Sequence, residues 1–506
     1  MFCSVVSTVI YGVEAIPISV EADVSDGFPS FTIVGYVGAQ VKEAEERVRT
    51  ALRNIGIRLP PKRITINLSP GNLRKEGTRF DLPIAAAILA ATGVIPGSRL
   101  RGLMLLGELH LDGKVEAVPG VLPSLLVAKE EGCYGCLVPS LNVYESGMVS
   151  DLSVWGLDSL KDLVAFAKDG VIPESGAERD EQGEVSENKV DFSQIRGQEA
   201  VKRVAVIAAA GFHNLMLSGP PGSGKSMTAR RMPGILPPLT EEESLELSGI
   251  YSIAGQLPDH KGMIKMRPFR APHHSISPSA LCGGGRIPHP GEITLAHRGV
   301  LFLDEFPEMP ASTLEMLRQP LEDRQITISR MDYSFSFPAE FLLVTAMNPC
   351  PCGYYPDKSR CKCTDYAIAK YRMKLSGPIL DRMDLICDVP EVQYEELKTG
   401  GEDPLSTAVM QEKVMRAAEI QRERYRQEGW LFNSELKPER LERYCPLTEE
   451  AERLLERAFR SLHLSARGYH RILKLARTIA DLDGADVIQT IHVGEAISYR
   501  STERNG

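Results

Sequence analysis

The sequence predicts an α/β protein with a parallel sheet at its centre. Three observations predict this fold. Between Asp191 and Pro390, short apolar runs alternate with helical stretches, as in a parallel sheet with crossover helices. A glycine-rich segment, GPPGSGKS, occupies 219–226 within that region. From about Val392 onward the spacing of apolar residues is helical throughout.

The chain has 506 residues, enough for about three domains. The first predicted domain is an α/β unit at 1–170. Residues 171–190 are acidic, polar and poor in aromatic side chains, which is the composition of a linker. The predicted parallel-sheet core follows at 191–392, and a predicted helical domain at 393–506 ends the chain.

Two elements of the first domain can be read from their periodicity. Ile64–Leu68 alternates apolar and polar residues, so a strand is expected there. Val41–Gly56 carries apolar residues along one side at helical spacing, so an amphipathic helix is expected.

The bulk composition excludes some classes of protein. The net charge is −9, which argues against a surface coated in positive charge but leaves room for a local basic groove. The longest apolar runs, such as Ile84–Ala91, are far shorter than the ~18–20 residues of a membrane span. The first residues contain neither a basic region nor a cleavage site of a signal peptide, so we expect a cytoplasmic protein.

The GPPGSGKS segment fits the phosphate-binding pattern G-x-x-x-x-G-K-[ST]. Its glycines let backbone N–H groups face the phosphates, the lysine supplies positive charge, and the last hydroxyl can ligate Mg²⁺. A short apolar run, Asn214–Ser218, precedes it as a strand, and Met227–Met232 follows as a helix. The predicted ATP-binding residues are Gly219, Pro220, Pro221, Gly222, Ser223, Gly224, Lys225 and Ser226.

Two further apolar strands end in polar side chains. One ends in Asp304 and Glu305. There Asp304, together with Ser226, is expected to hold Mg²⁺, and Glu305 is expected to activate the attacking water. The other ends in Asn348, where a residue that senses the γ-phosphate is expected.

Four cysteines lie close together after Asn348, as two C-x-C pairs: Cys350, Cys352, Cys361 and Cys363. Four thiolates at this spacing can close around one Zn²⁺. A closed site of four cysteines leaves no position for a substrate, so the expected zinc is structural.

The segment 255–298, between the two ATP motifs, is rich in glycine, proline and histidine. Its cationic and histidine side chains can follow a nucleic-acid backbone, or they can support the ATP site and the contacts between subunits. The sequence leaves both interpretations open. The residues concerned are Arg267, Arg270, His273, His274, Arg286, His289 and Arg298.

Several motifs together resemble the AAA+ superfamily, in the branch that holds magnesium-chelatase ATPase subunits and MCM helicases. They are GPPGSGKS, VLFLDE, TAMNPCPCG, GPILDRMD and SARGYHRILKLARTIADL. FRAPHHSIS, GGGRIPHPGEITLAH and LRQPLEDRQITISR extend the resemblance to the magnesium-chelatase-like YifB/ComM family. The resemblance covers nearly the whole chain.

The resemblance implies roles for four more residues. Gln198 would flank the adenine of ATP. Arg382 resembles the arginine finger that reaches into the ATP site of a neighbouring subunit. Arg467 or Arg471 resembles the sensor arginine of a helical lid, and the spacing does not decide between the two. Such cations stabilise the charge that develops during phosphoryl transfer.

The first domain resembles the ribosomal S5 domain 2-like fold of Lon protease and of the C-terminal part of RadA, through segments such as ITINLSPGNLRKEGTRFDLPIAAAILA. Lon uses a Ser nucleophile and a Lys base. Gly77–Pro83, which replaces the nucleophile segment, contains no Ser, and no Lys stands at the partner position. A non-proteolytic module for assembly or binding is therefore expected. Lys75, Arg79 and Asp81 are expected to stabilise its fold, with contact to DNA as the alternative.

The resemblance implies a ring-forming ATPase, expected to be a hexamer, that uses ATP and Mg²⁺ to move or remodel DNA. Within the family's range, the activity would be branch migration in recombination or natural transformation. The alternative is a chelatase-type motor that remodels a partner protein. An ATP-dependent protease is disfavoured by the missing Ser and Lys.

Overall fold

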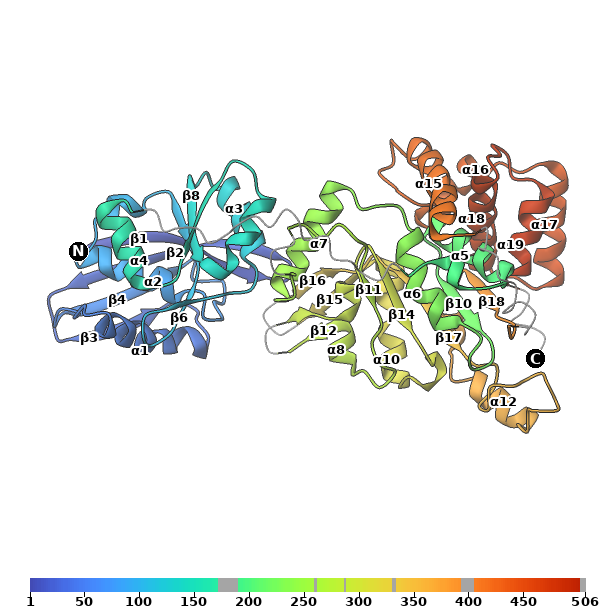
Figure 1. Ribbon diagram of the computed structural model, residues 1–506, viewed down its shortest axis with the longest axis horizontal. Helices are drawn as coiled ribbons and strands as arrows, with labels where there is room; N and C mark the ends of the chain where they lie inside the picture. The colour runs from blue at the N-terminus through green and yellow to red at the C-terminus, as the bar shows by residue number, and fades with distance from the viewer. Residues whose placement is uncertain (172–189, 259–261, 286–287, 330–333, 393–404, 501–506) are drawn as a thin grey trace.

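The computed structural model describes residues 1–171, 190–258, 262–285, 288–329, 334–392 and 405–500. Figure 1 shows an elongated molecule with the N-terminal domain at one end, the nucleotide-binding core in the middle and the C-terminal helices at the other end. Most of the predicted linker 171–190 and the side chain of Arg286 lie outside the described residues.

The N-terminal domain is built on a seven-stranded mixed sheet with the order β3-β4-β2-β1-β5-β8-β9. Strand β2 pairs antiparallel with both β1 and β4. The pairs β1–β5, β5–β8 and β8–β9 are parallel. The strands are β1 (Phe2–Tyr11), β2 (Glu14–Ser25), β3 (Ser30–Val34), β4 (Arg63–Ser69), β5 (Leu103–Leu105), β8 (Gly135–Pro139) and β9 (Ser153–Leu157), with a small separate pair, β6 (Glu108–Leu109) and β7 (Val115–Glu116).

The helices of this domain cover the sheet with their apolar faces. They are α1 (Ala39–Asn54), α2 (Asp81–Ala91), α3 (Val121–Glu130) and α4 (Leu160–Asp169). The predicted amphipathic helix is confirmed as α1, which buries Val41, Val48 and Leu52. The predicted strand is confirmed as β4, where Ile64, Ile66 and Leu68 alternate into the core.

The charged residues expected to stabilise this domain are buried and bonded. Lys75 donates to the backbone oxygen of Pro70. Arg79 donates to the backbone oxygen of Pro119, and burial lowers its pKa to about 10. Asp81 accepts a hydrogen bond of 2.7 Å from Arg47.

The core contains a five-stranded sheet in which every pairing is parallel, in the order β11-β14-β17-β10-β18. The predicted α/β fold with a parallel sheet is thereby confirmed. Its strands are β10 (Leu215–Ser218), β11 (Phe269–Arg270), β14 (Val300–Leu303), β17 (Leu342–Met347) and β18 (Leu385–Asp388). Two hairpins accompany it: β12 (Gly283–Gly284) with β13 (His289–Pro290), and β15 (Gln325–Ser329) with β16 (Ser334–Pro338).

Helices of the core connect these strands. The longer ones are α5 (Glu199–Gly211), α6 (Lys225–Ile235), α7 (Glu241–Ile253) and α12 (Asp365–Arg372). Shorter helices are α8 (Pro278–Cys282), α9 (Glu292–Leu295), α10 (Ala311–Met316), α11 (Arg318–Asp323) and α13 (Gly377–Leu380).

The C-terminal part is helical, as the spacing predicts. Its helices are α15 (Thr407–Arg424), α16 (Leu441–Tyr444), α17 (Glu449–Ser461), α18 (Ala466–Leu482) and α19 (Thr490–Ser498). They share one apolar core with α5 and α6. A buried hydrogen bond of 2.9 Å from Gln421 to the backbone oxygen of Ala210 fixes α15 against α5. Among the described residues, no helix is long and apolar enough to span a membrane.

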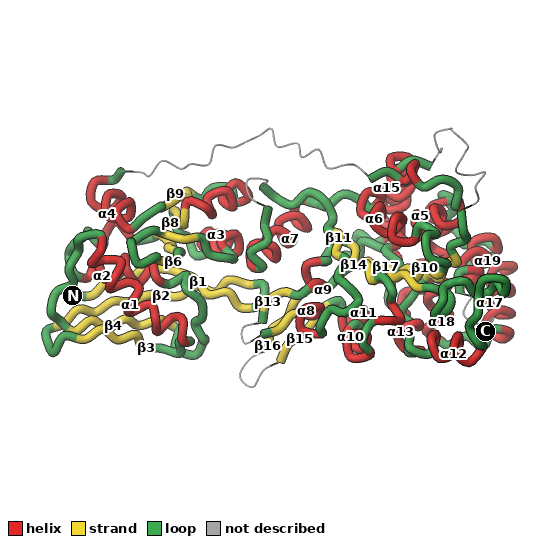
Figure 2. Tube along the Cα trace, turned by 60° about the horizontal axis from the view of Figure 1, so that its bottom comes forward, coloured by secondary structure: helices red, strands yellow, loops and turns green. Residues whose placement is uncertain are grey.

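The N-terminal domain packs on the core through α7. Leu247, Ile250 and Tyr251 of α7 share an apolar cluster with residues of β5, α3 and β8. At the end of α7, the Ser252 hydroxyl donates to the Glu145 carboxylate at 2.6 Å. Figure 2 shows β1 and β2 extending toward the hairpin β15–β16, where the rings of Tyr11 and Phe335 lie 4.3 Å apart.

Candidate ATP site

The glycine-rich segment forms a loop between β10 and α6, as a phosphate-binding loop requires. Gly222 and Gly224 have φ angles of 79° and 87°, in the left-handed region that favours glycine. Gly224 also caps the N-terminus of α6, which begins at Lys225. Free N–H groups and the positive end of the helix dipole therefore meet at this loop.

Lys225 is buried, and its ammonium donates to the backbone oxygens of Gly219 and Pro220 at 2.6 and 2.8 Å. Burial lowers its pKa, and the nearby Asp304 carboxylate opposes that shift. The Ser223 hydroxyl is 1% exposed and has no hydrogen-bond partner. A buried cation beside an unsatisfied buried hydroxyl suits a loop that receives a phosphate group.

Gln198 supports this loop from the start of α5. Its side-chain amide donates to the backbone oxygens of Ser223 and Pro390 at 2.7 and 3.3 Å. Its own amide oxygen is buried without a partner. The implied contact of Gln198 with adenine stays a prediction. The contact that the structure shows is with Ser223 of the phosphate loop.

Asp304, Glu305 and Asn348 lie beside the phosphate loop at the C-terminal edge of the sheet. The Ser226 hydroxyl donates to Asp304 at 2.9 Å, so the two predicted Mg²⁺ ligands are adjacent. The Asn348 amide oxygen lies 3.3 Å from the Lys225 ammonium. Glu305 follows with φ at 48°, a backbone conformation uncommon for a residue other than glycine, and its side chain is 55% exposed.

His274 contacts Glu305, a pairing that the sequence analysis did not identify, although it named His274 among the residues able to support the ATP site. Its Nδ1 lies 2.8 Å from the Glu305 carboxylate, and its ring is tilted against that of His273, with the two centroids 4.1 Å apart. The residue follows β11, and β11 is the parallel neighbour of β14. Strand order, which the sequence does not give, was the missing signal.

The three arginines lie away from the phosphate loop of their own chain. Arg382 precedes β18 and pairs with Glu322 at 2.5 Å, and Arg467 pairs with the other oxygen of Glu322 at 3.1 Å. Arg471 lies 3.6 Å from Asp384. The backbone N–H groups of Asp384 and Leu385 donate to the Asn214 oxygen, so this cluster lies beside the N-terminal end of β10.

A cavity of about 480 Å³ opens beside these arginines, between the core and the C-terminal helices. Arg382, Arg471 and Lys474 line it together with Glu322 and Asp384. The Nε atom of Arg382 is buried there without a partner. Burial lowers the pKa of Lys474 to about 8.

The four clustered cysteines converge beside the phosphate loop. Their sulfur atoms all lie within 4.8 Å of one another, and those of Cys350, Cys352 and Cys361 are 3.4 to 3.8 Å apart. Thiolates at ~2.3 Å from a tetrahedral zinc would be about 3.8 Å apart, so the donor set fits this metal. A hydrogen bond from the Tyr354 backbone lowers the pKa of Cys352, whereas burial and the neighbouring thiols raise the pKa of Cys361 and of Cys363.

The turn within the cysteine cluster touches the phosphate loop. A Cβ atom placed on Gly353 would lie 2.6 Å from a side-chain atom of Pro221. The cysteine cluster therefore lies in direct contact with the predicted phosphate-binding loop.

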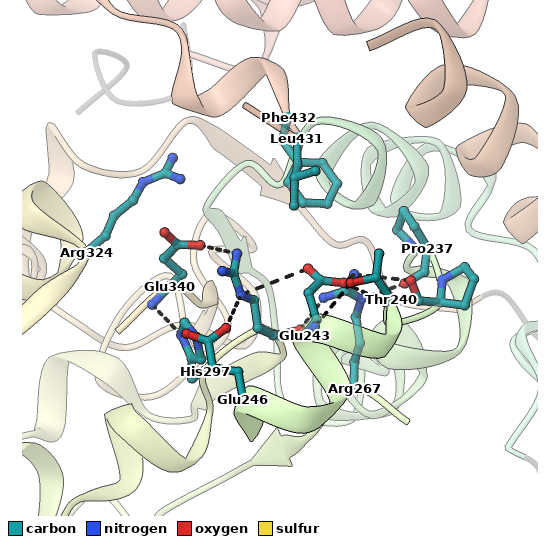
Figure 3. Close-up of polar contacts among 12 residues, drawn as sticks. Pro237, Thr240, Glu243, Glu246, Arg267, His297, Arg324, Glu340, Leu431 and Phe432 are labelled. Carbon is teal, nitrogen blue, oxygen red and sulfur yellow. Dashed lines mark hydrogen bonds and ion pairs between the residues drawn. The ribbon is translucent and has the colours of Figure 1, made fainter. Parts of the chain in front are cut away.

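The basic residues of 255–298 correct one sequence expectation. Arg267 is 6% exposed and donates to the backbone oxygens of Pro237 and Arg298 at 2.5 and 2.6 Å, and to Glu243 at 3.2 Å. Figure 3 shows this cluster, with Glu246 and His297 beside it. A DNA-contacting role for Arg267 is wrong, because a buried and saturated guanidinium cannot reach a nucleic-acid backbone.

Two more arginines of this segment are held by carboxylates. Arg270 donates twice to Glu292 at 2.6 Å. Arg298 pairs with Glu246 and Glu340. Of the two interpretations that the sequence left open, support of the core therefore describes these residues.

Comparison with known proteins matches three family models along the chain. They are the magnesium chelatase subunit ChlI at 191–397, the subunit ChlI of Mg-chelatase at 20–142, and the ChlI C-terminal part at 404–500.

Single proteins match as well. The chain is 43% identical to competence protein ComM of Haemophilus influenzae over 497 residues, 97% of this chain and 96% of ComM. It is 42% identical to YifB of Escherichia coli over 494 residues, 97% and 96% of the two chains. The magnesium-chelatase 38 kDa subunit of Rhodobacter capsulatus is 24% identical over 176 residues, 31% of this chain and 50% of that subunit.

Arg267→Ala is expected to destabilise the core by about 3–5 kcal/mol, because it removes the nearer of the two cations beside the buried Glu243. Urea unfolding of the variant measures the change. Lys265→Ala is the matched control, since Lys265 is exposed two residues away. An unchanged unfolding midpoint in Arg267→Ala would show that the buried pair does not support the core.

Proposed function

The chain belongs to the magnesium-chelatase-like YifB/ComM family, and we propose that it is the subunit of an ATP-driven ring that moves or remodels DNA. The observation that carries the ATPase assignment is the meeting of Lys225, Ser226, Asp304, Glu305 and Asn348 at one edge of the parallel sheet. This set provides a cation, two ligands for Mg²⁺, a general base and a polar sensor.

The residues divide the work of hydrolysis. ATP supplies the phosphoryl group, and Mg²⁺ neutralises charge on its phosphates. Lys225 and the loop N–H groups would hold the β- and γ-phosphates, while Ser226 and Asp304 hold Mg²⁺. Glu305 would take the proton of the attacking water, and His274 fixes the position of its carboxylate. Asn348 contacts Lys225 and so adjoins the γ-phosphate position.

We propose that Arg382 and Arg467 act on the ATP of a neighbouring subunit. The four-residue strand β10 separates them from their own phosphate loop, a distance of about 13 Å. An arginine there completes the site only if a second copy presents its loop to this face. Arg471, which contacts Asp384, lies at the same end. The family resemblance suggests a hexamer.

The proposal that DNA is the substrate rests on the resemblance to the YifB/ComM family. The specific activity proposed is branch migration, and the proposed compartment is the cytoplasm. The competing proposal is a motor that remodels a partner protein, favoured by the match of residues 191–397 and 404–500 to magnesium chelatase subunit models. In either case the N-terminal domain would be an S5 domain 2-like module without protease activity.

Lys225→Ala is expected to weaken ATP binding, and Glu305→Gln to bind ATP but hydrolyse it about 10²–10⁴-fold more slowly, because only the general base is lost. Nucleotide titration and phosphate release measure the two effects. Wild-type turnover in purified Glu305→Gln protein would refute the assignment of the base.

Arg382→Ala tests whether Arg382 acts on the ATP of a neighbouring subunit. Mixed with Lys225→Ala subunits, it should regain part of the activity, since some interfaces then hold both an intact loop and an intact arginine. Normal turnover by assembled Arg382→Ala protein alone would place the finger elsewhere.

Protein purified without added metal is expected to carry about one zinc per chain, because the four sulfur atoms fit one tetrahedral ion. Metal analysis measures it, and Cys361→Ser should lower both the zinc content and the thermal stability. Cys133→Ser is the control, since Cys133 lies outside the cluster. Active, folded protein without zinc would contradict the proposal.

ATP turnover is expected to rise when single-stranded or branched DNA is added, and the stimulation should fall steeply with salt because the contacts are mainly to phosphates. Phosphate release with and without single-stranded, duplex and branched DNA measures it. Turnover that ignores every DNA form at low salt would favour a partner protein as the substrate.

A further inference from the structure

The N-terminal domain carries a hollow of about 410 Å³ on the side of its edge strand β3. The hollow lies between β3, the C-terminal half of α1 and the segment that leads into β4. In Figure 1, β3 lies at the end of this domain away from the nucleotide-binding core. Neither the ATP site nor the contact with α7 includes any of its residues.

Four cations and no carboxylate line the hollow. The cations are Arg49, Arg53, Arg58 and Lys62. The remaining lining is mostly apolar, with Phe31, Ile57, Leu59 and Ile64 among it. In a chain with a net charge of −9, four cations around one apolar hollow form a local positive site.

The cations differ in how far the fold engages them. Arg49 pairs with Glu45 and lies over the ring of Phe31, and Lys62 pairs with Asp26. Arg53 and Arg58 are exposed, and within the part of the chain that the structure describes neither side chain has a hydrogen bond or an ion pair. Their guanidinium groups therefore remain available to an anion.

An aromatic side chain stands beside the hollow. Phe28 is 90% exposed and directly precedes Pro29, the first of the lining residues. An exposed ring next to an apolar hollow and free guanidinium groups offers stacking for a base and charge for a phosphate. A duplex keeps its base faces covered, so the combination matches an unpaired strand.

We propose that this hollow binds single-stranded nucleic acid, with phosphates on Arg53 and Arg58 and a base against the apolar lining and Phe28. The proposal rests on the proposed function, since it gives the DNA motor a contact outside its ATPase core. An acidic peptide would satisfy the arginines but has no planar apolar group for the hollow and the ring.

The test measures binding of a fluorescein-labelled oligothymidylate to the full chain over a series of salt concentrations. In the double variant Arg53→Ala/Arg58→Ala, the slope of log Kd against log salt should fall by about 1.4, because each phosphate contact on a single strand contributes ~0.7. Phe28→Ala should weaken binding about tenfold and leave the slope unchanged, because stacking releases no counterions.

The matched control is Arg63→Ala/Arg101→Ala, which removes the same charge from the same domain. Arg63 and Arg101 are both exposed. Successive strand residues face opposite sides of a sheet, and Ile64 faces the hollow, so Arg63 points away from it. This control should keep the wild-type slope. Basal ATP turnover and thermal stability should be unchanged in all these variants.

The outcomes separate the two proposals. If the wild-type chain binds oligothymidylate and both double variants show the same slope, the hollow does not hold DNA while the motor proposal stands. If the wild-type chain binds no DNA at low salt, both proposals fall. Binding of a labelled polyglutamate peptide that Arg53→Ala/Arg58→Ala abolishes, with DNA binding unaffected, would assign the hollow to an acidic protein instead.

Discussion

The parallel register of β10, β17 and β14 is the constraint on which the rest of the core depends. Ser218 pairs with Met347, and Leu303 pairs with Thr345. The phosphate loop follows β10, Asn348 follows β17 and Asp304 follows β14. The parallel register therefore brings all three together at the C-terminal edge of the sheet. A slip of one residue in β14 would turn its alternate side chains to the other face and withdraw Asp304 from Ser226. Buried pairing on both sides of β10 and β17 opposes such a slip.

The opposite edge of the same sheet is equally specified. Asn214 accepts the N–H groups of Asp384 and Leu385, and its own N–H donates to the Asp384 carboxylate at 3.0 Å. Burial raises the pKa of Asp384, but the hydrogen bond to His213 and the charge of Arg471 outweigh burial. The pKa of Asp384 therefore lies well below its usual range. This side chain thus stays ionised and fixes the loop that carries Arg382. Glu322 then holds Arg382 and Arg467 together, so the chain presents two cations at the edge away from its own nucleotide loop.

Much of this could be predicted from the sequence because it depends on local pattern. The periodicity of α1 and β4, the strand–loop–helix setting of Lys225 and the carboxylates after β14 are all readable within one segment. What could not be predicted depends on strand order and burial. His274 reaches Glu305 only because β11 adjoins β14. Arg267 looks like a surface cation in sequence, and its burial arises from partners at Pro237, Glu243 and Arg298, up to 31 residues away.

The helix α7 explains why the two domains form one continuous body. At its start Glu243 pairs with the buried Arg267. One turn later the Glu246 carboxylate lies 3.2 Å from Nε2 of His297, and this contact lowers the pKa of Glu246 to about 2. At its far end Ser252 donates to Glu145, which burial makes a weaker acid by raising its pKa.

Arg79 lies near this end of α7, where burial lowers its pKa and the charge of Glu145 opposes that shift. It occupies Gly77–Pro83, the segment in which the Lon resemblance would place a nucleophile. Its guanidinium donates to Pro119 and to the hydroxyls of Thr8 and Ser124. A helix of 13 residues therefore connects a cluster beside β14 to the interior of the N-terminal domain. A shift of α7 during the ATP cycle would have to move that domain or break buried hydrogen bonds.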